Sequence, residues 1–304
     1  MKTDKNKTLI VVGAGFAGLQ LVKSLKNTPL RIVLIDKSNH HLFQPLLYQV
    51  AVSALSPADI SAPIRTILKR QKNVEVILGE VTDIDKSNKS VTVDGQKVNF
   101  DFLVLAPGSR HSYFGKDNWE ENAPGLKTLK DALNIRENML VSFEEAENEA
   151  FLTGKNIPVK FVVIGGGPTG VEIAGSLAEI ATKTLRNDFR NIDTRQTKII
   201  LVEGSGKLLG AYDSPLNEKA AENLRNMGVE VRLNTMVTNI DEKGVTLGDE
   251  RIETRNIIWA AGVGGETVAQ TLGVETDRAG RIKVLPDLSL PGHPAVFALG
   301  DIVT

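Results

Sequence analysis

The sequence Gly-x-Gly-x-x-Gly occurs twice in this chain, and this repeat constrains the fold more than any other feature. The first copy consists of Gly13, Gly15 and Gly18, and the second of Gly165, Gly167 and Gly170. Each copy follows four apolar residues typical of a buried parallel strand and precedes an apolar stripe with helical spacing. In this context the first glycine permits a tight turn, the second lets the backbone approach a pyrophosphate, and the third lets helix and strand pack closely. The two copies therefore predict two dinucleotide sites in one polypeptide.

The composition narrows the class of protein. A chain of 304 residues corresponds to about two domains, and its 41% hydrophobic and 24% charged residues are typical of a globular protein. The net charge of −1 gives no electrostatic basis for binding nucleic acid. The chain has no cysteine, which excludes disulfides, thiolate metal sites and cysteine nucleophiles, and its four histidines lack metal-ligand spacing. Redox chemistry would therefore need a bound organic cofactor, and no metal is expected.

The pattern along the chain predicts an α/β fold with two doubly wound, Rossmann-like domains, produced by duplication of one mononucleotide-binding unit. Strands are expected at 9–12, 30–35, 102–105, 161–164, 198–202, near 229–240, at 256–260 and at 295–299. Helices are expected at 16–27, 127–150, 168 to about 190, and 214–227. Residues 74–100 alternate between apolar and polar and predict a small β-meander. Residues 153–156 predict a turn at a domain boundary.

Three carboxylates lie where they could contact the predicted ligands. Asp36 ends the second expected strand, and Glu203 is its equivalent in the second copy. Both suit the hydroxyl pair of a ribose, and for Asp36 this role is favoured over the alternative of an ordinary surface residue at a strand end. No arginine follows Glu203 closely, which favours NADH over NADPH, although the nearby Lys207 weakens this inference. Glu172 lies in the first turn after the second glycine motif, where it either interacts with the helix dipole or contacts the nicotinamide end of the cofactor.

Several longer motifs resemble the type II, single-subunit NADH:quinone oxidoreductases, which are flavoproteins with two dinucleotide-binding domains. The motifs are Gly13-Ala14-Gly15-Phe16-Ala17-Gly18, Gly165-Gly166-Gly167-Pro168-Thr169-Gly170-Val171-Glu172, Ala298-Leu299-Gly300-Asp301, the block from His41 to Ala51, Leu55-Ser56-Pro57, Ala62-Pro63-Ile64-Arg65, His111-Ser112-Tyr113-Phe114-Gly115 and Trp259-Ala260-Ala261-Gly262-Val263. The resemblance covers essentially the whole chain, and the block at 41–65 is its most specific part.

The resemblance implies FAD at the first glycine motif and NADH at the second. The implied FAD contacts are Gly13, Gly15, Phe16, Ala17, Gly18, Asp36, Lys37, Gln44, Val81, Ala106, Gly108 and Asp301. The implied NADH contacts are Gly165, Gly167, Thr169, Gly170, Glu203, Ala261 and Gly262, with Glu172 facing the nicotinamide. Gln44 to Tyr48 would line the flavin and quinone side, so Gln44 and Glu172 are the expected catalytic residues. The alternative for Gln44 to Tyr48 is a hydrophobic loop packed on the sheet.

The sequence departs from the family pattern at two places. The family usually has Ala-Thr-Gly after the fourth strand, whereas this chain has Ala106-Pro107-Gly108, and proline removes an N–H and a hydroxyl. Family members also continue well beyond the Gly300-Asp301 motif, with an Ala-Gln pair near the flavin, dimer contacts and membrane-binding helices. This chain stops at Thr304. We therefore expect a C-terminally truncated chain; the alternative is a protein without the quinone and membrane apparatus.

These observations predict a discontinuous FAD domain at 1–112 and 280–304, a connecting helix at 113–155 and an inserted NADH domain at 156–279. The resemblance implies ping-pong transfer of a hydride from NADH to FAD, followed by two-electron reduction of a quinone without proton pumping. It also implies a cytoplasmic protein, peripheral contact with the cytoplasmic face of the membrane in full-length members, and it allows a homodimer. The alternatives are an NADH-dependent flavin reductase or oxidase that acts on oxygen or an electron-carrier protein, and a non-catalytic nucleotide-binding fragment.

Overall fold

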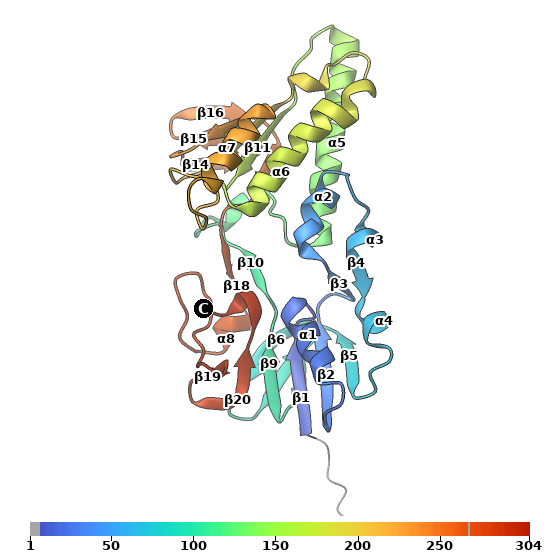
Figure 1. The fold of residues 1–304 in the computed structure, drawn as a ribbon, viewed down its shortest axis with the longest axis vertical. Coiled ribbons are helices and arrows are strands. Elements are labelled where there is room, and N and C mark those ends of the chain that lie inside the picture. The colour runs from blue at the N-terminus through green and yellow to red at the C-terminus, as the bar shows by residue number, and fades with distance from the viewer. Residues whose placement is uncertain (1–6, 267) are drawn as a thin grey trace, which may run out of the picture. The chain divides into compact units, whose positions relative to one another are not determined.

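The computed structural model describes residues 7–266 and 268–304, so residues 1–6 of the expected FAD domain lie outside the described residues. Contacts divide the chain into two compact units (Figure 1). Unit 1 contains the described part of Met1–Leu42, Ser61–Arg110 and Val263–Thr304; unit 2 contains Phe43–Ile60 and His111–Gly262. The contacts thus group 113–155 and 43–60 with the second glycine motif, and 263–279 with the first. The ligand of each unit stays a prediction.

Unit 1 is built on a six-stranded sheet in the order β19-β20-β9-β1-β2-β5. The strands are β1 (Lys7–Val12), β2 (Leu30–Asp36), β5 (Val74–Leu78), β9 (Phe102–Leu105), β19 (Ser289–Leu290) and β20 (His293–Ala298). All neighbours pair in parallel except β19 and β20. The central strand β1 has Ile10 and Val11 fully buried, because parallel strands are covered on both faces.

Shorter elements complete unit 1. They are α1 (Phe16–Ser24), β3 (His40–Leu42), β4 (Ser61–Pro63), α4 (Ile64–Leu68), β6 (Val81–Asp85), β7 (Ser90–Val93), β8 (Gln96–Asn99), β10 (Ser109–His111, of which His111 belongs to unit 2), β18 (Val263–Gly265), α8 (Val268–Thr271) and the 3₁₀ turn η6 (Gly300–Ile302). The expected meander is formed by β6, β7 and β8. The expectation that it begins at residue 74 is wrong, because β5 pairs in parallel with β2 in the main sheet. Val74 and Val76 of β5 pack on the core of that sheet, which determines the pairing.

Unit 2 repeats the parallel sheet in the order β13-β12-β11-β17. The strands are β11 (Lys160–Ile164), β12 (Lys198–Val202), β13 (Val229–Arg232) and β17 (Asn256–Trp259), and a separate antiparallel sheet contains β14 (Val237–Asp241), β15 (Gly244–Leu247) and β16 (Glu250–Glu253). The single strand expected near 229–240 is therefore two strands in different sheets. The chain changes sheets at Leu233–Met236, where Asn234 adopts a φ of +50°.

The helical elements of unit 2 include one long amphipathic helix, α5. The elements are η1 (Gln44–Leu46), α2 (Leu47–Ala51), α3 (Pro57–Ile60), η2 (Asp117–Trp119), α5 (Leu129–Thr153), α6 (Pro168–Glu179), η3 (Ile180–Thr184), η4 (Leu185–Asn187), η5 (Thr194–Gln196) and α7 (Leu216–Asn226). Thr128 and Asp131 form a capping box at the start of α5, and Gly154 ends it in the left-handed conformation, as the predicted turn requires. The helix expected to reach about residue 190 is α-helical only to Glu179; a π-helical turn and a 3₁₀ turn follow.

Candidate dinucleotide sites

The first glycine loop, residues 13–18, needs glycine at two positions for packing and leaves the third open. Gly13 has a φ of +98°, and a Cβ there would lie 2.2 Å from the carbonyl oxygen of Ala106. A Cβ on Gly18 would lie 1.9 Å from the carbonyl oxygen of Gly13. By contrast, a Cβ on Gly15, the N-cap of α1, would meet no described atom within 4 Å. This open space at a helix N-terminus fits a pyrophosphate that approaches the backbone closely.

The second glycine loop, residues 165–170, repeats this geometry. Gly165 has a φ of +112°, and a Cβ on Gly170 would lie 1.8 Å from its carbonyl oxygen. Gly167 is the N-cap of α6, and a Cβ on Gly167 would have no described atom within 4 Å. The Gly165 N–H donates to Val202 at 2.8 Å, as the Gly13 N–H donates to Ile35 at 2.8 Å. An equivalent backbone hydrogen bond thus holds each loop to the neighbouring strand.

Each strand-end carboxylate joins its glycine loop to the loop that follows the strand. The Asp36 carboxylate accepts hydrogen bonds from the N–H groups of Ala14 and Ser38, both at 2.6 Å. The Glu203 carboxylate accepts from Gly166 and Ser205, both at 2.7 Å. We call each pair of bonds a carboxylate bridge. A carboxylate has about four acceptor sites, so each bridge leaves lone pairs for a ribose hydroxyl.

The sequence interpretation missed this bridging role. The sequence holds no signal for it, because the donors are the backbone N–H groups of Ala14, Ser38, Gly166 and Ser205, and every residue except proline carries such a group. His41 was also missed as a support of the first loop: its Nδ1 hydrogen-bonds the carbonyl of Ala14 at 2.9 Å, and its ring lies edge-on to Phe16.

Most of the residues expected to contact FAD come from loops of unit 1 that meet the first glycine loop. Ala106 follows β9 and packs against Gly13 and Gly18, while Gly108, with a φ of +82°, has open space beside it. At the end of β20, a Cβ on Gly300 would lie 3.3 Å from the Cβ of Ala17. Asp301 accepts from the Ser109 hydroxyl at 3.5 Å. The carboxyl ends of three adjacent strands thus gather these groups, as expected for a site in a doubly wound sheet.

Three further expected FAD contacts are differently placed. Lys37 forms an ion pair with Glu266 at 3.1 Å, and Val81 is buried at the start of β6. Gln44 begins η1 in unit 2, and α2, which follows it, packs on α5 and α6. The alternative of a hydrophobic loop packed on the sheet is wrong, because Leu47–Ala51 forms a helix that packs on helices.

The expected NADH contacts surround the second glycine loop in unit 2. Thr169 lies in the first turn of α6, and Ala261 and Gly262 follow β17. The Ala260 N–H donates to Ile164 at 2.7 Å, which fixes this turn beside the loop. Glu172 is largely exposed on α6, and no hydrogen bond or ion pair joins its carboxylate to the described residues. Removal of part of its hydration raises the pKa of Glu172, because desolvation disfavours the ionised form.

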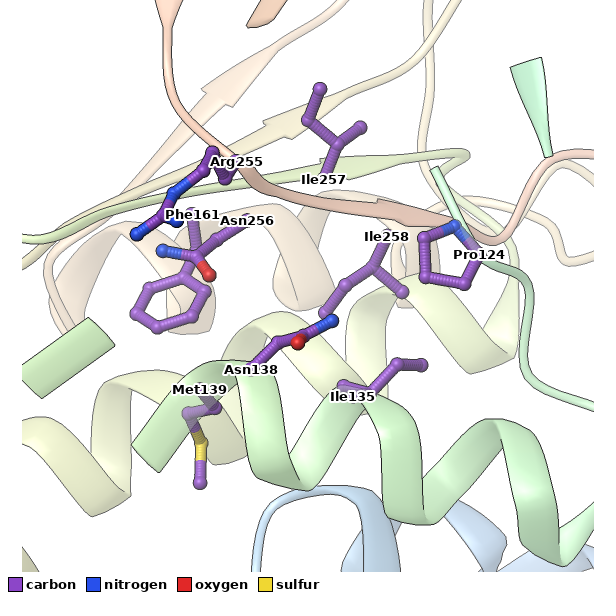
Figure 2. A pocket seen from close by; sticks show the side chains of 9 residues that line it. All are labelled: Pro124, Ile135, Asn138, Met139, Phe161, Arg255, Asn256, Ile257 and Ile258. Carbon is purple, nitrogen blue, oxygen red and sulfur yellow. The ribbon is translucent and has the colours of Figure 1, made fainter. Parts of the chain in front are cut away.

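A small pocket in unit 2 lies away from the second glycine loop (Figure 2). Its lining residues are Pro124, Ile135, Asn138, Met139, Phe161, Arg255, Asn256, Ile257 and Ile258. Phe161 and Asn256 pair at the amino ends of β11 and β17, whereas the glycine loop follows the carboxyl end of β11. The Asn256 side chain is already bonded to Ser142 and to the carbonyl of Lys160. This pocket is therefore a gap between α5 and the sheet rather than part of the dinucleotide site.

The two parallel sheets, each with a glycine loop and a carboxylate bridge at its edge, define an α/β fold with two Rossmann-like sheets, and comparison with known proteins agrees. Residues 7–304 match the family model described as "Pyridine nucleotide-disulphide oxidoreductase", and the chain belongs to that family. Within it, the chain is a homologue of the type II NADH:quinone oxidoreductases. It is 42% identical to the type II NADH:quinone oxidoreductase Ndh of Mycobacterium tuberculosis and 44% identical to NdhA of the same organism, over 97% of this chain in both cases.

The chain spans 66% of the length of each of these two relatives. A probable NADH dehydrogenase of Dictyostelium discoideum is 33% identical over 99% of this chain and 68% of its own length. Among solved structures, NDH2 from Plasmodium falciparum in complex with NADH superposes with a TM-score of 0.87 at 24% identity, covering 98% of this chain and 64% of that chain. This last similarity supports the α/β fold with two Rossmann-like sheets.

Proposed function

We propose that the protein transfers two electrons from NADH to a quinone through a bound FAD. The reaction NADH + H⁺ + quinone → NAD⁺ + quinol is balanced, because the hydride carries both electrons and one proton and solvent supplies the second proton. The order is ping-pong, and no proton is pumped. The observation that carries the proposal is the duplicated site: each unit has its own open N-cap glycine and carboxylate bridge.

The first glycine loop, Asp36 and the groups around Gly108 and Asp301 would hold FAD. When bound, FAD supplies the hydride acceptor and the electron donor to the quinone. The N–H groups at the start of α1 would bind its pyrophosphate, and Asp36 would accept from a ribose hydroxyl while it bridges Ala14 and Ser38. Gln44 would lie on the flavin and quinone side.

The second glycine loop and Glu203 would hold NADH. A carboxylate that accepts from a 2′-hydroxyl repels a 2′-phosphate, so Glu203 supports a preference for NADH over NADPH. Lys207 is the nearby cation, and its ammonium group reaches the carbonyl of Tyr212 at 3.5 Å. Glu172 would orient the nicotinamide end and hold a proton more readily than an ordinary glutamate does, because its pKa is raised.

The quinone as acceptor rests on the 42–44% identity to type II enzymes. Contact with a membrane and a homodimer belong to the same proposal. Within the described residues, no helix combines the length and apolar character needed to cross a bilayer.

The test is an anaerobic titration of the purified chain reconstituted with FAD. NADH should bleach the flavin absorbance, and a short-chain quinone should restore it. Bleaching that only oxygen or an electron-carrier protein reverses would favour the alternative acceptors. A protein that neither retains FAD nor is bleached by NADH would refute the proposal.

A further inference from the structure

Phe114 combines an unusual backbone conformation with a largely exposed aromatic side chain. Its φ is +53°, in a region that bulky side chains rarely adopt, and Gly115 follows with a φ of +85°. The ring is 71% exposed, whereas the preceding Tyr113 is buried and stacks on Trp259 at 4.9 Å. Backbone strain of this kind is concentrated at ligand-binding sites and switches, where the surrounding structure maintains it.

The Phe114 ring lies on the turn that follows β17. A Cβ on Gly262 would lie 2.6 Å from Cζ of Phe114, so the tip of the ring contacts the backbone of Gly262. The ring also lies edge-on to Trp259, with centroids 6.2 Å apart. Gly262 has a φ of +83° and no room for a side chain while Phe114 keeps this position.

The order of strands places this turn at one end of the expected dinucleotide. Glu203 follows β12, the second glycine loop follows β11, and Ala260 follows β17, and these three strands are adjacent and parallel. Ala260 contacts the glycine loop directly, because a Cβ on Gly165 would lie 2.6 Å from its carbonyl carbon. With a ribose at Glu203 and the pyrophosphate at the glycine loop, the remaining half of the dinucleotide extends toward β17, where Phe114 lies.

We propose that Phe114 is a positioning residue for NADH, whose exposed phenyl ring covers the nicotinamide end of the bound dinucleotide and excludes water from it. This inference rests on the proposed NADH site of unit 2. An aromatic ring packs favourably on a nicotinamide ring in an offset or edge-on geometry. The contact would also bury the exposed surface of the Phe114 ring.

Phe114→Gly is the sharpest variant, because glycine adopts a positive φ without strain. A merely structural role predicts a lower Tm, whereas we expect Phe114→Gly to keep or raise the Tm. We expect its NAD⁺ affinity, measured by calorimetry, to fall about tenfold, because a strong aromatic contact contributes about that much to binding. KM for NADH should rise, and Phe114→Tyr should restore both values. Phe151→Ala is the matched control, since Phe151 is 73% exposed in the last turn of α5 and should not affect NAD⁺ binding.

Tryptophan emission gives a second readout. The chain has two tryptophans, Trp119 and Trp259, whose ring centroids lie 5.8 Å apart, and Phe114 lies beside Trp259. NAD⁺ should change the emission of the wild-type protein and change that of Phe114→Gly less. Unchanged NAD⁺ affinity in Phe114→Gly, or a loss that Phe114→Tyr fails to restore, would overturn the inference and leave the proposed function standing. A wild type that binds NAD⁺ through Phe114 but is not bleached by NADH would refute the proposed function alone.

Discussion

Each glycine loop contains tightly packed glycines and one glycine with open space beside it, so replacement by alanine should have a different effect at the two kinds of position. In the second loop, Gly170→Ala would place a methyl group 1.8 Å from the Gly165 carbonyl oxygen, and Cβ contacts below 3.0 Å are essentially never seen. Helix α6 and the loop must therefore move apart. Gly167→Ala meets no described atom within 4 Å, and its φ of −74° and ψ of 179° suit alanine. We expect Gly170→Ala to impair folding and Gly167→Ala to impair binding.

The magnitudes follow from these geometries. Overpacking of a tight contact costs about 1–3 kcal/mol, and a backbone clash belongs at the upper end, so Gly170→Ala should lower the Tm of unit 2 by about 4–12 °C. Alanine at an N-cap costs at most about 1 kcal/mol relative to glycine, so Gly167→Ala should melt close to wild type. Its methyl group would instead occupy the open space where a pyrophosphate approaches the N–H groups. We expect NAD⁺ affinity to fall at least about tenfold, or 1.4 kcal/mol.

The assay combines thermal unfolding with calorimetric titration of NAD⁺. Gly18→Ala and Gly15→Ala form the matched pair in unit 1, where FAD retention replaces NAD⁺ affinity as the binding readout. The reasoning is refuted if Gly167→Ala binds NAD⁺ like the wild type, or if Gly170→Ala melts like the wild type.

Three further substitutions test single interactions. Glu203→Gln keeps only one of the two acceptor oxygens that bridge Gly166 and Ser205, so it should weaken the binding of both NADH and NADPH. It should also lower the NADH/NADPH ratio of kcat/KM, and an unchanged ratio would show that Glu203 does not set the preference. Phe143→Ala removes a ring that is 1% exposed and lies about 6 Å from the rings of Phe161 and Phe189, and it should cost about 3–5 kcal/mol in urea unfolding, with the exposed Phe151→Ala as a near-neutral control. Burial raises the pKa of Glu172 above 4.5, so its contribution to stability is present below that pH and is lost as the pH rises through the raised value. Glu172→Gln should therefore melt above the wild type at pH 7 but not below pH 4.5, and a Tm difference independent of pH would contradict this.

The glycine loops could be predicted from the sequence because their geometry is local. Gly13 and Gly165 have a positive φ, and the following helix packs within van der Waals contact of the strand end. Both features require glycine at a fixed spacing, so the spacing alone predicts this part of the fold. The turn that ends α5 could be predicted for the same reason, since Gly154 acts within one turn of the helix, whereas the helix begins two residues later and ends three residues later than expected.

Features that depend on distant partners could not be predicted. Val74–Leu78 has the alternating pattern of a meander strand, but its valines fit the core of the parallel sheet, and that fit is not visible in a local pattern. The segment Leu47–Ala51 reads as apolar without indicating its partners, which are α5 and α6. The carboxylate bridges also escaped prediction, because their donors are backbone N–H groups, which every residue except proline carries.

The two proposed sites differ in what surrounds them, although their glycine loops and carboxylate bridges are alike. In unit 1 the first glycine loop is met by two further chain segments, Ala106–Gly108 and Gly300–Asp301, so a bound dinucleotide would be contacted from several strands. In unit 2 the second glycine loop is likewise met by two segments, Ala260–Ala261 and Leu208–Leu209. The difference is Phe114, whose exposed ring lies on Gly262 and has the room to move that a backbone segment lacks. A ping-pong reaction needs FAD to be retained through repeated turnover while NAD⁺ leaves after each hydride transfer, and we expect the mobile ring of Phe114 to allow that exchange at the second site.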